Sequence, residues 1–245
     1  MPASDLRHGP ISNPFATRYV RPGVIPWVGS GDAQLESIVS RFDALDRCAA
    51  IVGPHGSGKT TLLHHLVPML VDRWEFISPD GKTTAHVAPP PSNLRSGQEE
   101  VNFANDRMGV WLQLRRGQSQ RLGWLGSRRG SGRVQLWILD GYEQLYWYEK
   151  LVVRLERYRS RFGLLVTSHT RPLQVPQLFN TELGSETAMQ VIQQIGRDLE
   201  PNRLRMALPS ESKLKEMLER ESGSLREVFM SLYDDFEQAT QSEAG

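Results

Sequence analysis

Residues 53–60 of this 245-residue chain have the sequence Gly53-Pro54-His55-Gly56-Ser57-Gly58-Lys59-Thr60. This segment fits the pattern G-x-x-x-x-G-K-[ST] at every position. An apolar run at 48–52 precedes it, and a helical pattern follows it from Thr60 to about Val71, with Pro68 expected to kink or end the helix. Glycines let such a loop turn tightly, so backbone N–H groups aim at phosphate oxygens, and the helix adds the positive end of its dipole. The sequence therefore predicts a phosphate-binding loop between a buried strand and a helix.

Side chains of this loop have expected roles in holding a nucleotide with its magnesium ion. The Lys59 ammonium would bridge the β- and γ-phosphates, and the Thr60 hydroxyl would bind Mg²⁺. We expect the binding site to include the whole loop and the next residue, Thr61. Asp140 follows the apolar run 134–139 and is expected to hold the same Mg²⁺ through water. The alternative is that Asp140 caps the helix that follows it.

Hydrolysis also requires a group that orients or deprotonates water near the γ-phosphate. The residue after Asp140 is Gly141, and the nearest carboxylate beyond it is Glu143. A bend at Gly141 could bring Glu143 toward the phosphate. Alternatively, Glu143 is an ordinary carboxylate in the first turn of a helix, where the helix dipole favours it. The sequence thus leaves open both a slow hydrolase and a protein that binds nucleotide with scarcely any turnover.

Apolar strand patterns alternate with helical patterns along most of the chain. This alternation indicates an α/β fold, in which helices cover both faces of a parallel sheet and the ligand lies at the carboxyl ends of the strands. Residues 79–100 contain Pro-Asp-Gly and three successive prolines, and are expected to form a surface excursion. Strands are expected at 48–52, 110–114, 134–139, 162–168 and about 173–178, and helices at 32–45, 60–71, 143–159, 186–199 and 211–239, the last interrupted near Gly223.

The expected division of the chain has four parts. Residues 1–31 are rich in Pro and Gly and are expected to be extended. An α/β core at 32–182 and a helical segment at 183–239 follow. The polar tail at 240–245 is expected to be frayed.

Charge and cysteine content exclude several classes of protein. Lys and Arg number 29 against 28 Asp and Glu, and this net charge of +1 argues against a surface coated with basic groups for bulk nucleic-acid or membrane binding. Cys48 is the single cysteine, so no intrachain disulfide or Cys-based zinc site can form, and a reducing cytoplasm is the simplest location. No stretch has the pattern of a signal peptide or a membrane span. No structural metal is expected, because ligand spacing is absent among His55, His64, His65 and His169.

Four further segments lie in a fixed order around the glycine loop. They are Trp27-Val28-Gly29 with Asp32-Ala33-Gln34-Leu35, Asp140-Gly141-Tyr142-Glu143-Gln144-Leu145, Leu164-Leu165-Val166-Thr167-Ser168-His169, and Gly223-Ser224-Leu225-Arg226. With the glycine loop as Walker A, they resemble the adenine-side entrance, the Walker B motif, the sensor 1 strand and the sensor 2 arginine of AAA+ and STAND (NACHT-like) ATPases. These belong to the ASCE division of P-loop NTPases. The chain departs from the family pattern in three places: the entrance lacks its Arg, Gln144 replaces a second acid, and His169 replaces an Arg.

The resemblance implies a three-layer P-loop NTPase fold with a parallel sheet and a small C-terminal helical lid at 183–239. An extra strand of this family lies between the Walker A and Walker B strands, a role that residues 110–114 can fill. Thr167 or Ser168 would touch the γ-phosphate or the attacking water, and Arg226 would approach the γ-phosphate from the lid. The alternative for Arg226 is a solvated helix arginine. ATP and Mg²⁺ would lie between core and lid, and the nucleotide state would control lid position or assembly.

A basic, glycine-rich span without acidic residues lies between Asp106 and Asp140. Such a loop could bind nucleic-acid phosphates, with Trp124 stacking on a base. It could equally dock an acidic partner, place an arginine in a neighbour's ATP site, or be a solvated loop. Its arginines are Arg107, Arg115, Arg116, Arg121, Arg128, Arg129 and Arg133.

The expected function is that of an ATP-binding NTPase, a slow Mg-dependent ATP hydrolase that acts as a switch or assembly factor on a protein partner or through self-association. The chain lacks an Asn-Lys-x-Asp motif, which favours ATP over GTP. The alternatives are a small-molecule or nucleotide kinase and a nucleotide-binding module without hydrolysis. An ABC-type subunit would need a Leu-Ser-Gly-Gly-Gln signature shortly before Asp140, and the partial match at 94–98 lies too far upstream. Core packing is the expected role of most aromatic residues at 142–148, with a small partner-binding patch as the alternative.

Overall fold

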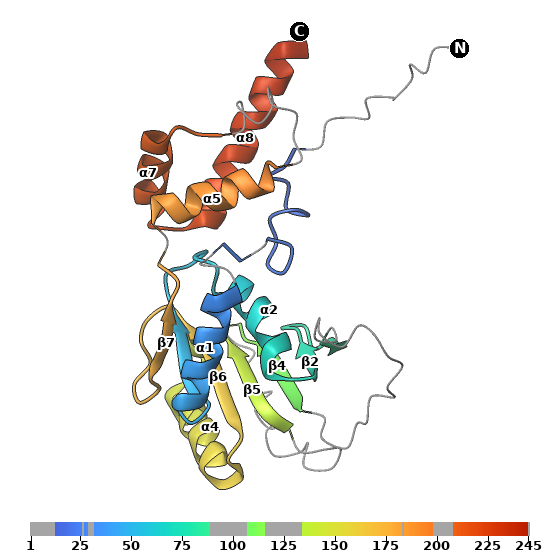
Figure 1. Cartoon of the computed structure of the whole chain (residues 1–245), viewed down its shortest axis with the longest axis vertical. Helices are drawn as coiled ribbons and strands as arrows, with labels where there is room; N and C mark the ends of the chain where they lie inside the picture. The colour runs from blue at the N-terminus through green and yellow to red at the C-terminus, as the bar shows by residue number, and fades with distance from the viewer. Residues whose placement is uncertain are drawn as a thin grey trace, which may run out of the picture. The chain divides into compact units, whose positions relative to one another are not determined.

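The computed structural model describes residues 13–25, 27–28, 32–88, 107–115, 134–182, 184–197 and 208–244. The chain forms two compact units (Figure 1). The first unit combines Met1–Val28 with Leu183–Gly245, and the second is Gly29–Glu182. The glycine loop belongs to the second unit.

The second unit is built on one seven-stranded sheet with the order β3-β2-β4-β5-β6-β1-β7. All neighbouring strands are parallel except β2 and β3, which are antiparallel. The sheet, with the helices that flank it, confirms the predicted α/β fold. The strands are β1 (Cys48–Val52), β2 (Arg73–Ile77), β3 (Thr83–Val87), β4 (Met108–Gln113), β5 (Val134–Asp140), β6 (Gly163–Ser168) and β7 (Gln177–Asn180).

The strand order corrects the expectation that residues 110–114 form the strand between the Walker A and Walker B strands. Residues 110–114 do contribute most of a strand, β4, but β4 lies on the far side of β5 from β1. The strand between β1 and β5 is β6, which follows both in the sequence. All six residues of β6 are buried, because it pairs with β1 along one edge and with β5 along the other. A short apolar run predicts that a strand exists, but its neighbours are chosen by long-range pairing.

Residues 79–100, expected to form a surface excursion, begin with a β-hairpin instead. β2 and β3 pair antiparallel across a turn in which Gly81 has a φ of 90° and the Ser78 N–H donates to the Lys82 carbonyl at 3.0 Å. The sequence pattern missed β3 because all five of its residues are exposed and no burial alternation marks it. Residues 89–106 lie outside the described part of the chain.

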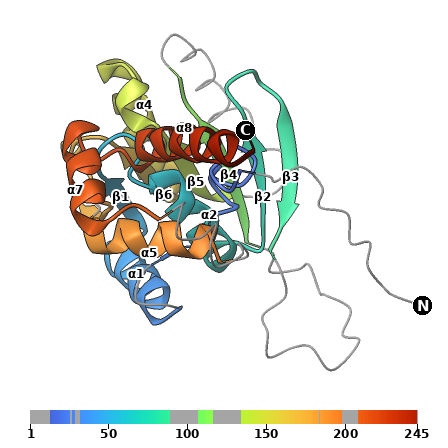
Figure 2. The same cartoon turned by 90° about the horizontal axis from the view of Figure 1, so that it is seen from above.

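Helices lie on both faces of this sheet. α1 (Asp32–Ala44) and α2 (Lys59–Leu70) are on one face, and α4 (Trp147–Ser160) is on the other (Figure 2). The Trp111 ring of β4 contacts His64 of α2, with ring centroids 4.7 Å apart. The next residue, Leu112, points the other way, into the apolar core that includes Val153 of α4. Because side chains alternate along β4, successive residues pack against the helices on opposite faces of the sheet.

Two helices differ from their expected form. α2 continues through Pro68 to Leu70, so the proline does not end it. The helix expected at 143–159 is divided into a 3₁₀ turn, η5 (Tyr142–Gln144), and the helix α4. The Glu149 carboxylate stabilises the start of α4, because it accepts from the N–H of Tyr146, the residue before the helix, at 2.7 Å. The expected core packing of the aromatic residues at 142–148 holds for Tyr142 alone, because the other three are exposed.

The first unit contains α5 (Ser185–Ile195), α7 (Glu211–Arg220) and α8 (Leu225–Ala244). Residues 13–25, expected to be extended, instead form a series of turns, and Phe15 and Ile25 are buried in the same core as the helices. α8 includes residues 240–244, so the expected frayed tail is helical there. Among the described helices, none is long and apolar enough to cross a membrane.

Candidate functional site

The glycine loop joins the buried strand β1 to the first turn of α2. Gly58 caps α2 with a φ of 89°, a left-handed conformation that favours glycine. Gly53 lies against β7: a Cβ atom there would be 2.2 Å from Thr181 Oγ1 and 2.8 Å from Ser57 Oγ. The loop therefore needs glycine at one position for its backbone conformation and at the other for its close approach to a neighbouring segment.

Thr181 fixes the loop from the side of β7. Its Oγ1 lies 2.6 Å from Ser57 Oγ in a buried hydrogen bond, and its N–H donates to the Val52 carbonyl at 2.8 Å. Sequence reasoning missed this residue, because its position depends on the parallel pairing of β7 with β1. A threonine after a strand gives no signal of its own.

Lys59 lies inside the loop with its side chain buried. Its Nζ donates to the Gly53 carbonyl at 2.7 Å and to the Pro54 carbonyl at 2.6 Å. Burial lowers the pKa of the ammonium, while the carboxylates of Glu143 and Asp140 act to raise it. The structure thus places a buried cationic side chain against two backbone carbonyls of the glycine loop.

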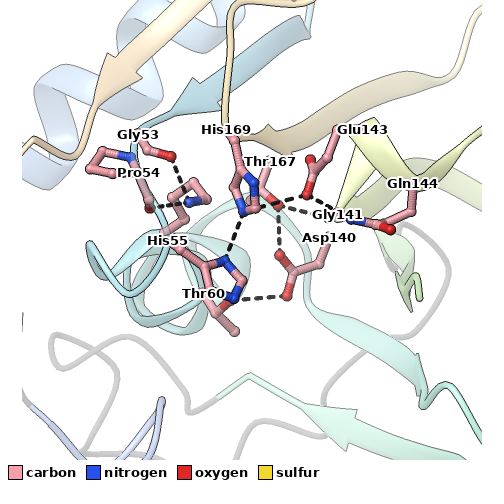
Figure 3. A network of polar contacts seen from close by, with 11 residues as sticks. Gly53, Pro54, His55, Thr60, Asp140, Gly141, Glu143, Gln144, Thr167 and His169 are labelled. Carbon is pink, nitrogen blue, oxygen red and sulfur yellow. Dashed lines mark hydrogen bonds and ion pairs between the residues drawn. The ribbon is translucent and has the colours of Figure 1, made fainter. Parts of the chain in front are cut away.

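Asp140, the last residue of β5, contacts both the end of the glycine loop and the strand β6. Thr60 Oγ1 donates to Asp140 Oδ2 at 3.0 Å, and Thr167 Oγ1 donates to Asp140 Oδ1 at 2.6 Å (Figure 3). The Thr167 oxygen also accepts from the Gly141 N–H at 2.9 Å. Burial raises the pKa of the Asp140 carboxyl, against the lowering effect of both hydroxyl donors and of Lys59. Asp140, Thr60 and Thr167 therefore meet at the carboxyl ends of β5 and β6.

Glu143 follows on the η5 turn. Gly141 has a φ of 95°, so the chain bends there as expected. Glu143 Oε1 accepts from Gln144 Nε2 at 3.3 Å and lies 3.5 Å from His169 Nε2, whereas Oε2 is buried without a hydrogen-bond partner. The buried Oε2 is an acceptor that a water or ligand hydroxyl could satisfy.

Two histidines connect Glu143 to the glycine loop. His55 Nδ1 and His169 Nε2 are 2.9 Å apart, and His169 also faces Glu143 (Figure 3). Burial lowers the pKa of His169, an effect that Glu143 opposes and that Lys59 and His55 strengthen. His55 has no other assigned role in the loop pattern, and His169 follows β6 directly, at the position where the ATPases that the sequence resembles have an arginine. The pair was not expected from sequence, because it requires β6 to lie beside β1.

The remaining site candidates are Thr61, Arg226 and the arginines of the basic span. Thr61 is buried in α2, and Arg226 lies in the first turn of α8 in the other unit. Of the basic span, residues 116–133 lie outside the described residues. Arg107, at its start, is held by Asp72 through a 3.0 Å ion pair. The sensor 2 role of Arg226 and the nucleic-acid role of the basic span stay predictions.

The residues at the end of β5 and the start of α2 suit a small, hard cation. They offer a carboxylate and a hydroxyl, which are oxygen donors of the type that Mg²⁺ prefers together with water and phosphate oxygens. Within the described residues there is no group of three or more His, Cys, Asp or Glu side chains that could hold a metal. A site with one carboxylate and one hydroxyl fits a cation that arrives with a phosphorylated ligand.

Comparison with models of known protein families gives no match to this chain, and a comparison with curated proteins finds no similar sequence. The functional assignment therefore rests on the residues of the site and on the order of the strands that position them.

Proposed function

We propose that this chain is an ATP-binding protein of the P-loop NTPase type, a slow Mg-dependent ATP hydrolase that works as a switch or assembly factor. The observation that supports this most directly is the 3.0 Å hydrogen bond from Thr60 Oγ1 to Asp140 Oδ2. Thr60 directly follows Lys59, whose side chain is buried. A Mg-nucleotide site requires a phosphate loop and a metal-binding carboxylate to meet in this way. The two residues are 80 positions apart in the sequence, so the contact is a property of the fold.

The strand order supports a place within the ASCE division. Its distinguishing feature is an extra strand between the Walker A and Walker B strands. In this chain β6 lies between β1, which leads into the glycine loop, and β5, which ends at Asp140. Thr167, near the end of β6, then occupies the position of the sensor 1 residue. A similarity to the AAA+ and STAND groups rests on the order of the motifs along the chain.

The described residues have complementary roles toward Mg-ATP. Lys59 and the loop N–H groups bind the phosphates, and Thr60 and Asp140 hold the ion. When bound, Mg²⁺ neutralises charge on the phosphate oxygens. Glu143, with one buried and unpaired carboxylate oxygen, accepts a hydrogen bond from the attacking water and then its proton. His169 lies 3.5 Å from the other oxygen of Glu143, a contact that would restrain the carboxylate and so slow the turnover that we propose.

The first test is the binding of Mg-ATP by Lys59→Ala, measured by titration calorimetry. Loss of a charge-assisted contact to phosphate should weaken binding by roughly ten- to a hundred-fold. The matched control is Lys82→Ala, which removes an exposed lysine from the β2–β3 turn. An unchanged affinity for Mg-ATP in the Lys59 variant, with its fold intact, would show that the loop is not the nucleotide site.

The second test is phosphate release by Glu143→Gln. This change should slow hydrolysis by about a hundred-fold or more while ATP binding is retained, because the amide cannot accept a proton from water. Glu156→Gln, in α4, serves as the control. A turnover equal to that of the wild type would assign the water to another group, and transfer of phosphate to an added acceptor would identify a kinase.

A second candidate function is nucleotide binding without hydrolysis. The contacts of Glu143 Oε1 with His169 and Gln144 favour it, because these two groups occupy an oxygen that an attacking water would otherwise contact. ATP binding that depends on Lys59, together with no phosphate release from the wild type, would select this function over the hydrolase.

A further inference from the structure

Most of the apolar side chains of α4 are exposed. Its buried residues are Glu149 and Val153. Trp147 is 78% exposed and Tyr158 is 84% exposed. An ordinary amphipathic helix directs its apolar stripe toward the core, so a stripe turned toward solvent indicates an interaction surface. The outer stripe of α4 consists of Trp147, Tyr148, Leu151, Leu155 and Tyr158.

Arginines border the outer stripe on both sides. At 100° per residue, Arg154 lies about 60° to one side of Leu151, and Arg159 lies about 80° to the other. Both arginines are exposed. The acidic residues of the helix, Glu149 and Glu156, lie on the inward side, about 160° and about 140° from Leu151. The outward face of α4 is therefore apolar along its middle and positively charged along both borders.

This charge pattern disfavours a second copy of the chain as the occupant. Two stripes packed together would bring the same arginine borders toward one another without acidic residues to compensate. A negatively charged partner surface fits instead. The aromatic residues lie at both ends of the stripe, where Trp and Tyr rings with polar tips suit the boundary between apolar and aqueous phases.

The composition of α4 favours a membrane surface. α4 is the one described α-helix of the second unit on its face of the sheet, so no other described helix of that unit covers its outward side (Figure 2). A basic helix with Trp, Tyr and Leu on its exposed face is typical of segments that lie in the headgroup region of an anionic membrane.

A cavity of about 510 Å³ adjoins the C-terminal end of the outer stripe and shares Tyr158 with it. Three arginines line the cavity, Arg47, Arg157 and Arg161, and a single acidic residue, Asp46, accompanies them. Arg157 is already oriented by Asp46, whose carboxylate accepts from its Nη2 at 2.7 Å. The volume and the excess positive charge suit a phosphate headgroup.

We propose that α4 docks on an anionic phospholipid surface, with its outer stripe in the headgroup region and a lipid phosphate in the neighbouring arginine cavity. This site lies at the opposite ends of β5 and β6 from Asp140 and Thr167, since Val134 and Gly163 line the cavity. The binding of lipid is therefore separate from the binding of nucleotide, and either can fail without the other.

The test is co-sedimentation of the whole chain with vesicles of phosphatidylcholine alone, and with vesicles that contain about one quarter phosphatidylserine. The wild type should sediment with the anionic vesicles, and salt should weaken this binding. Leu151→Asp with Leu155→Asp, and separately Arg154→Glu with Arg159→Glu, should each reduce binding by about ten-fold or more. The control is Leu173→Asp, since Leu173 is also exposed but lies outside α4.

Three results would overturn the proposal. They are no sedimentation of the wild type with anionic vesicles, sedimentation of the stripe variant equal to that of the wild type, and a lipid-free dimer that the stripe variant dissociates. The last result would make the outer stripe a protein interface. All the substituted side chains are exposed, so unchanged thermal unfolding is expected and separates lost docking from lost folding.

Discussion

At the scale of single residues, Thr167 connects β6 to the carboxyl end of β5, where Asp140 lies. Its hydroxyl donates to Asp140 on β5 and accepts from the Gly141 N–H, with distances of 2.6 and 2.9 Å. Thr167 is almost fully buried, so water cannot easily replace either bond. The orientation of the Asp140 carboxylate therefore depends on this one side chain as much as on Thr60.

Thr167→Val should lower the free energy of unfolding by about 1–3 kcal/mol, because it leaves a buried carboxylate oxygen and a backbone N–H without their partner. Thr167→Ser keeps the hydroxyl and should retain most of the stability. Urea unfolding of the three proteins measures the difference. A Val variant as stable as the wild type, beside a destabilised Ser variant, would mean that packing of the methyl group matters here and that the hydrogen bonds do not.

Sequence patterns predicted some of the site residues better than others. The glycine loop and Asp140 each follow a buried strand, so the carboxyl ends of parallel strands bring them together. The contact between His55 and His169 and the contact between Ser57 and Thr181 depend on which strands are neighbours. A single-sequence pattern contains no information on that choice. The roles assigned to these residues in catalysis stay predictions until they are measured.

At the scale of elements, the junction between the glycine loop and the end of β7 has little room. Gly53→Ala should destabilise the second unit by about 1–3 kcal/mol, because the new Cβ would be 2.2 Å from Thr181 Oγ1. Combining it with Thr181→Ala should recover part of the loss, since the two changes act at one contact. Gly184→Ala is the control, because a Cβ atom at that position would have no neighbour within 4 Å. Full additivity of the Gly53 and Thr181 changes in urea unfolding would contradict this geometry.

Elements with a strong burial pattern were predicted and elements without one were missed. β1, β5 and β6 are almost wholly buried, and each was expected from its apolar run. β3 is fully exposed and was missed. The turns at 13–25 were also missed, because Pro and Gly mark an irregular segment without showing what it packs against.

At the scale of the whole molecule, the first unit is assembled from both ends of the chain. Asn13 Nδ2 donates to the Tyr233 carbonyl at 3.0 Å and to Glu237 Oε1 at 2.8 Å, both on α8. The Phe15 ring stacks on Phe229, with centroids 6.2 Å apart. The helices near the C-terminus therefore complete their core with N-terminal residues.

Phe15→Ala should lower the unfolding free energy of the first unit by about 3–5 kcal/mol, because it leaves a cavity beside Phe229. Val24→Ala, an exposed position of the same segment, should change it little. Helical circular dichroism during urea unfolding follows the helices of both units, and the transition of the first unit should come at a lower urea concentration in the Phe15 variant than in the wild type. If both variants unfold like the wild type, the N-terminal segment does not contribute to the core.

The position of Thr181 against the glycine loop has a consequence for the order of events during synthesis. The hydrogen bond between Ser57 and Thr181 joins residues 124 positions apart, and β7 must pair with β1 before it can form. On the ribosome, the loop emerges long before β7 does. The nascent chain therefore carries an unfinished site for about half of its elongation. Because a ligand stabilises only the form that binds it, occupancy of this site would mark a chain whose second unit is complete.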